Sequence, residues 1–214
     1  AQRRGIAVVS SDADWLDVVG ALAASLGGNT ALTPTSGTVS VVWGPIGAPG
    51  RSSIASALAA EFASAGRTVI LIDADTYGSA QAASLGILDE SAGIAAACRA
   101  AVRGDLTVNS VDRYVHRFDG ADGHGFWLLS GLARAARWPE VDEDSFGQVI
   151  HVCSQWADDV IVAVGINLEQ DEEIACDMMA PHRNAAKLAA LRSAGVVVSA
   201  ARAEQGNILR SVRA

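Results

Sequence analysis

The stretch "VVWGPIGAPGRSSIASALAAEF", residues 41–62, passes from an apolar strand pattern through a Gly/Pro turn into a helical pattern. Strand, glycine loop and helix together hold phosphate in many proteins, because backbone N–H groups and the positive end of the helix converge on the anion. Gly47 and Gly50 permit positive φ, Arg51 adds positive charge, and Ser52 offers a hydroxyl to a magnesium ion. The stretch therefore predicts a phosphate loop.

The loop departs from the consensus G-x-x-x-x-G-K-[ST] at two positions. Pro45 occupies the first glycine position and Arg51 the lysine position, while Pro49 lacks a backbone N–H. An arginine binds phosphate through a fork of N–H groups and does not copy the compact charge of a lysine. An ordinary Gly/Pro turn between a strand and a helix is the alternative interpretation.

Two carboxylates follow the next apolar run, "TVILIDA" at residues 68–74. Ligands of open parallel sheets bind at the carboxyl ends of the strands, so Asp73 and Asp75 are expected close to the glycine loop. An Asp there can position water or a hydrated magnesium ion. In the alternative, Asp73 caps a turn and Asp75 starts the next helix.

Apolar runs rich in Val and Ile alternate with Ala/Leu helical patterns along the 214 residues, which predicts an α/β fold with a mostly parallel sheet and helices on both faces. The expected strands are 5–10, 38–44, 68–74, 126–131, 159–165 and 195–200. The expected helices are 13–26, 52–65, 79–86, 91–103, 107–117, 143–157, 183–194 and 204–212. Residues 1–27 are expected to form a βα unit that a Gly/Thr/Pro/Ser linker at 28–37 joins to the glycine loop, within a single domain of residues 1–214. Residues 117–125 are expected to be a surface loop.

Composition excludes several classes of function. The net charge of −8 argues against tight binding to nucleic acid. No apolar run has the length of a transmembrane segment. The three cysteines and four histidines have no metal-ligand spacing, so Cys98, Cys153 and Cys176 are interpreted as reduced core residues of a cytoplasmic protein. G-x-S-x-G and G-x-G-x-x-G are both absent, which disfavours an α/β-hydrolase and a dinucleotide-binding site.

Four segments in the same order resemble the MinD/ParA group of P-loop ATPases, which act in cell division, partitioning and appendage positioning. They are "WGPIGAPGRSS", "DADTYGS", "SGLARAARWPE" and "LEQDEEIACDMMAPHRNAAKLAAL", and the similarity runs from about residue 38 to residue 200. Within this group the chain is most similar to actinobacterial MinD-like proteins. The resemblance implies a three-layer P-loop NTPase fold, ATP and Mg²⁺ as cofactors, and a homodimer.

The resemblance also implies roles for individual residues. The loop residues that would cradle the phosphates are Gly47, Ala48, Gly50, Arg51, Ser52 and Ser53. Ser52 would lie near magnesium, and Asp75 falls where the group carries its water-positioning aspartate, with Asp73 just behind it.

Two positions depart from the pattern of the group. Ile46 stands where a second lysine usually reaches the nucleotide of the partner subunit, and Ala163 stands where the Walker B strand usually ends in an Asp that orders the water shell of magnesium. Loss of such a contact often costs ten- to a hundredfold in affinity or activity. Asp73 is expected on the adjoining strand and could partly substitute for the Asp that is missing at position 163. It is therefore a candidate metal-site residue.

The remaining features allow more than one interpretation. The acidic run at 169–173 is either a segment that responds to the γ-phosphate or a solvated face, and Arg183 and Asn184 either face nucleotide or partner or simply start a helix. Further units are expected after residue 200, so either the C-terminus is expected to be truncated, or the base to be held loosely or by a partner subunit. The sequence predicts an ATP-binding, dimerising switch with weak or absent hydrolysis; the alternative is a non-catalytic scaffold for partner proteins.

Overall fold

The structure is a computed structural model that describes residues 36–45, 50–87, 91, 93–120, 123–166 and 182–201, all within the unit Ser36–Ala214. The N-terminal βα unit and linker predicted for 1–37 lie outside the described residues, except for the last two residues of the linker. Also outside them lie Gly47 and Ala48 of the loop, Ile46, the acidic run 169–173, Cys176 and the helix predicted for 204–212.

The described strands form one six-stranded sheet in the order β3-β4-β2-β5-β1-β6. Their bounds are β1 Thr38–Trp43, β2 Val69–Ala74, β3 His116–Asp119, β4 Gly125–Leu129, β5 Asp159–Val164 and β6 Val196–Ser199. Neighbouring strands are parallel except for the antiparallel pair β3 and β4. The predicted α/β class with a mostly parallel sheet is confirmed.

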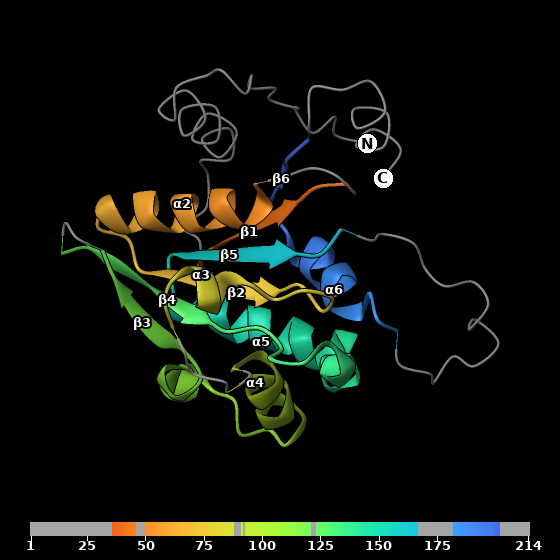
Figure 1. Cartoon of the computed structure of the whole chain (residues 1–214). Helices are drawn as coiled ribbons and strands as arrows, with labels where there is room; N and C mark the ends of the chain where they lie inside the picture. Colours follow the sequence, from red (N-terminus) through yellow and green to blue (C-terminus); the bar gives the residue numbers. More distant parts are fainter. Residues whose placement is uncertain are drawn as a thin grey trace, which may run out of the picture. The chain divides into compact units, whose positions relative to one another are not determined.

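Helices cover both faces of this sheet (Figure 1). Their bounds are α2 Arg51–Ser64, α3 Gln81–Ser84, α4 Gly93–Val102, α5 Glu143–Trp156 and α6 Ala185–Ser193, with short 3₁₀ helices η1 Val108–Arg113 and η2 Ala135–Glu140. The helix α2 lies on one face, and α4, α5 and α6 lie on the other. The predicted three layers are therefore present.

The central strands are buried on both sides, as parallel strands between helices must be. All six residues of β2 are buried, and so are all six of β5. Alternate side chains point to opposite faces, so Ile70 and Ile72 join the core under α4 and α5, whereas Leu71 faces α2. This two-sided burial is why the sequence reads as continuous apolar runs.

The helix predicted for 107–117 and the surface loop predicted for 117–125 are wrong. Thr107 and Ser110 form a capping box that starts only a 3₁₀ turn, and the chain then extends into β3. The pairs His116 with Leu128 and Asp119 with Gly125 join β3 to β4 as a hairpin. Four residues with alternating burial carry too weak a strand pattern to be recognised without the partner strand.

An ion pair holds the start of β5 to the segment that joins α2 to β2. Arg67 donates to the carboxylate of Asp159, whose side chain is 3% exposed, whereas the Arg67 side chain is 46% exposed. Burial raises the pKa of Asp159, and the Arg67 guanidinium counteracts that rise. The Asp159 carboxylate thus depends on one arginine for its main charged partner.

Arg67→Met should destabilise the fold, because it leaves a buried carboxylate without its cation. We expect a loss of about 1–3 kcal/mol in the free energy of unfolding, measured by urea denaturation at pH 7. Arg103→Met is the matched control: Arg103 pairs with Asp105, and both side chains are more than half exposed, so that change should cost under about 1 kcal/mol. Equal effects of the two substitutions would contradict this account.

Candidate functional site

The glycine loop leads from the end of β1 into the first turn of α2. Gly50 is the N-cap residue of α2 and has φ +91°, the left-handed conformation that favours glycine. Glycine has no side chain that could cap the helix, and no acidic residue stands in the first turn of α2. No side chain of the first turn therefore neutralises the positive end of the α2 dipole.

Arg51 connects the start of α2 to the end of β1. Its Nη1 donates to the carbonyl oxygen of Gly44 at 3.2 Å, and its side chain is half-buried. Ser52 and Ser53 are exposed, and the main-chain oxygen of Ser52 accepts a hydrogen bond from Gln81. The guanidinium is thus held at the carboxyl end of β1, with N–H groups left over for an anion.

Asp73 lies at the end of β2 and is buried, with 3% of its surface exposed. Its Oδ2 accepts from the backbone N–H groups of Ala80 and Gln81, both at 3.0 Å, and its Oδ1 accepts from that of Asp75 at 3.3 Å. Three of about four acceptor positions are therefore used within the protein. The interpretation of Asp73 as a cap describes this geometry; α3 starts at Gln81, not at the predicted residue 79.

Gln81 continues this network to α2. Its side-chain oxygen accepts from Ser56 Oγ at 2.7 Å, and its side-chain nitrogen donates to the Ser52 carbonyl at 3.2 Å. Gln81 is itself buried. Through Gln81, the carboxylate of Asp73 thus fixes the position of the helix that carries Ser52.

Asp75 forms a tight turn after β2. Its Oδ1 accepts from the N–H groups of Tyr77 at 2.9 Å and Gly78 at 3.1 Å, so it does not start a helix. A Cβ on Gly165, just after β5, would lie 2.8 Å from that same oxygen. A side chain at position 165 would therefore force the Asp75 carboxylate to shift from its place over the end of β5.

Ala163 lies between the two predicted parts of the site. It is paired in register with Val42 of β1 on one side and with Asp73 of β2 on the other. The predicted place of Asp73 on the strand adjoining Ala163 is therefore observed. The carboxylate of Asp73, however, accepts from the backbone N–H groups of residues 75, 80 and 81.

A group of side chains from residues 183–187 packs on the Asp75 turn. Thr76 Oγ1 donates to the carbonyl of Arg183 at 3.1 Å, and the Arg183 guanidinium lies 4.0 Å from the Tyr77 ring centroid. Asn184 is the N-cap residue of α6, so the predicted helix start is observed, two residues later than expected. Sequence reasoning missed Lys187, although one signal was available: it is the only lysine in the chain.

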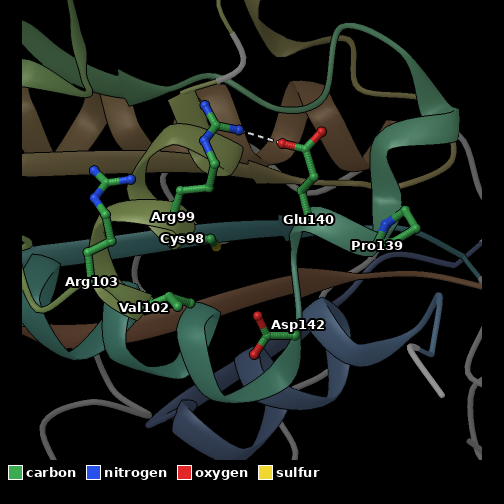
Figure 2. A pocket seen from close by; sticks show the side chains of 7 residues that line it. All are labelled: Cys98, Arg99, Val102, Arg103, Pro139, Glu140 and Asp142. Atoms are coloured by element: carbon green, nitrogen blue, oxygen red, sulfur yellow. Dashed lines mark hydrogen bonds and ion pairs between the residues drawn. The ribbon is translucent and has the colours of Figure 1, made fainter. Parts of the chain in front are cut away.

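A hollow among the described residues lies elsewhere, between α4 and the η2 segment (Figure 2). Its volume is about 340 Å³, and its lining residues are Cys98, Arg99, Val102, Arg103, Pro139, Glu140 and Asp142. Arg99 pairs with Glu140, and Arg103 pairs with Asp105. Because its two arginines have carboxylate partners, the hollow offers little net charge to an anion.

Two cysteines, Cys98 and Cys153, are buried and free, and burial raises the pKa of each thiol to about 12. They are core residues, as predicted. Among the described residues no helix is both long and apolar enough to cross a membrane.

Solved structures with this fold include the septum site-determining protein MinD of Pyrococcus horikoshii complexed with Mg-ADP (TM-score 0.58, 15% identity, 81% of this chain and 60% of that chain). A ParA family ATPase from Chlorobium tepidum matches at TM-score 0.60 and 16% identity, over 84% of this chain and 66% of that one. The kinase domain of the Escherichia coli tyrosine kinase ETK matches at TM-score 0.61 and 19% identity, over 92% and 69%.

These likenesses show that the chain has a MinD/ParA-like P-loop NTPase fold. The chain spans roughly two thirds or less of the length of the MinD and ParA structures. No protein-family model and no curated protein sequence matches it. The same fold serves an ATPase and a kinase, so the reaction must be inferred from the site itself.

Asp73 should make stability depend on pH. Burial, with a smaller contribution from Asp75, raises its pKa from 3.8 to about 6, so the folded protein holds a proton that the unfolded chain releases. The resulting stabilisation is present below about pH 4 and is lost as the pH rises to 6, by about 3 kcal/mol. Asp73→Asn removes this titration, so the difference in unfolding free energy between wild type and variant should change over pH 4–6. A difference constant from pH 4 to 7 would argue against this titration.

Gly165→Ala should displace the Asp75 carboxylate, because the added methyl group would stand 2.8 Å from its Oδ1. The amide NMR signals of Tyr77 and Gly78, which donate to that oxygen, should shift and exchange faster with solvent. Gly147→Ala in α5 is the control, since a Cβ there meets no atom within 4 Å. Unchanged amide signals in the Gly165 variant would show that the close approach has no effect.

Proposed function

We propose that this chain is a nucleotide-binding protein that holds Mg-ATP at the start of α2, dimerises in that state and acts as a switch for partner proteins. The process would be one served by MinD- and ParA-like proteins: cell division, partitioning or positioning of cellular appendages. We further propose a cytoplasmic location, since the sequence pattern favours reduced cysteines. The similarity to actinobacterial MinD-like proteins stays a prediction.

The observation that carries the proposal is the arrangement at the carboxyl edge of the sheet. The left-handed Gly50, the guanidinium of Arg51 and the uncapped start of α2 lie at the end of β1, and Asp75 lies at the end of β2. Backbone N–H groups, positive charge and a carboxylate are what a magnesium-bound phosphate chain needs. The fold is shared with a MinD structure complexed with Mg-ADP.

The residues fit magnesium nucleotide in part. Ser52 is exposed and lies in the first turn of α2, a position that suits its hydroxyl as a magnesium ligand. Gly47, Ala48 and Ser53 remain proposed members of the phosphate cradle. Asp73 has about one acceptor position left for a magnesium-bound water, so we propose a supporting role for it.

We propose that hydrolysis is weak or absent. Asp75 is the proposed water-positioning residue, and magnesium, when bound, would supply the charge that stabilises the leaving phosphate. Ala163, however, has no carboxylate that could bind the water shell of magnesium at the end of β5. The alternative, a scaffold without turnover, is favoured by the same Ala163 and by Ile46 in the loop.

Binding and turnover are separated by measuring phosphate release from Mg-ATP beside binding of a fluorescent ATP analogue. We expect saturable binding with slow or no release of phosphate. Absence of both signals would remove the nucleotide assignment, and rapid release would refute weak hydrolysis.

Arg51→Ala should weaken nucleotide affinity by about tenfold to a hundredfold, because it removes a charged hydrogen bond to phosphate. Asp75→Ala should affect affinity less, since its proposed partner is water. Titration of each variant with the fluorescent analogue measures this, with the exposed Arg117→Ala as control. The reverse order of effects would show that the two roles are misassigned.

A further inference from the structure

Lys187, the only lysine of the chain, is buried in the first turn of α6. It is 3% exposed, and its Nζ has one long hydrogen bond, 3.5 Å to the side-chain oxygen of Asn184. An ammonium has three N–H donors, so two of them have no partner among the described residues. No carboxylate of the described part of the chain lies within ion-pair distance of it.

A cation at this place is unfavourable for two physical reasons. Removing an ammonium from water without an anionic partner costs free energy, which is why buried lysines are normally paired. The first turn of a helix also carries the positive end of its dipole, and α6 has no acidic residue there. By contrast, Arg192 in the last turn of α6 pairs with Glu143 at the surface.

The surroundings of Lys187 belong to the proposed phosphate site. Asn184, which accepts from Lys187, also accepts from the hydroxyl of Tyr77 at 3.4 Å, in the turn that Asp75 forms. Figure 1 shows α6 at the end of the sheet toward which the arrowhead of β5 points. The ammonium is attracted by Asp75 and repelled by Arg51, so it lies within electrostatic reach of both. Burial lowers the pKa of Lys187 to about 8, chiefly through desolvation.

We propose that Lys187 binds the phosphate chain held by Arg51 and thereby supplies, from α6, the lysine charge that the loop lacks. The ligand is the di- or triphosphate group of a nucleotide, with pyrophosphate as its smallest form. This inference rests on the proposed function. An anion bound by both cations would remove the repulsion that Arg51 exerts on Lys187.

The binding test compares Lys187→Met with Lys187→Arg by calorimetric titration with Mg-ATP, Mg-ADP and magnesium pyrophosphate. Lys187→Met keeps the apolar stem and removes the charge, so affinity for all three should fall at least tenfold; Lys187→Arg should recover much of it. Arg192→Met in the same helix is the control and should leave affinity unchanged. Equal affinity of wild type and Lys187→Met would overturn the proposal.

A merely structural role, in which the Lys187 charge is attracted by Asp75 without a direct ion pair, makes the opposite prediction for stability. If Lys187 serves only to neutralise Asp75, then Lys187→Met should lower the melting temperature without ligand. If it serves a ligand, the ligand-free variant should melt at the same or a higher temperature, because an incompletely paired buried charge is removed. A lower melting temperature with unchanged affinity would refute the proposal.

A single lysine also permits a direct observation. In wild-type protein carrying lysine labelled with ¹⁵N at Nζ, the chain gives one side-chain signal. Magnesium pyrophosphate should shift this signal and raise the pKa of Lys187 above its value of about 8, because an anion stabilises the ammonium. An unmoved signal while Mg-ATP binds would overturn the role of Lys187 and keep the nucleotide function. A signal that moves with pyrophosphate in a protein that binds no nucleotide would support the phosphate site and refute the nucleotide function.

Discussion

The parallel pairing of β5 with both β1 and β2 is the constraint on which the rest of this molecule depends. It places Val42, Ala163 and Asp73 side by side across three strands, so the segments that follow these strands leave the sheet at one edge. The start of α2 and the Asp75 turn are brought together there although they are distant in sequence. Helices on both faces keep this register buried and therefore fixed.

The distribution of charge at this edge differs from what a loop motif alone suggests. The Asp73 carboxylate accepts hydrogen bonds from the N–H groups at the start of α3. Through Gln81 it also fixes the position of α2. Positive charge comes from Arg51 at the loop and from Lys187 on α6. In the proposed function, these two cations bind the phosphate anion, which is the arrangement of a binding site more than of a fast catalyst.

The sequence predicted the sheet, its mostly parallel order and the position of Asp73 beside Ala163, because long apolar runs and strand-end carboxylates are local patterns. It did not predict β3, whose four residues form a strand only by pairing with β4. The burial of Lys187 was equally hidden, since it depends on packing between segments that are 107 positions apart, as Thr76 and Arg183 are. The direction of the Asp73 carboxylate depends on the turn between β2 and α3, and the residue types of that turn do not determine its geometry.

A crystal structure grown with magnesium and a non-hydrolysable ATP analogue tests the central claim most directly. The account predicts phosphate density against the backbone of residues 47–53, with the Arg51 guanidinium and the Lys187 ammonium both within hydrogen-bond distance of phosphate oxygens. Density in the hollow beside Cys98, or an empty loop at saturating nucleotide with Lys187 still bonded to Asn184, would contradict it.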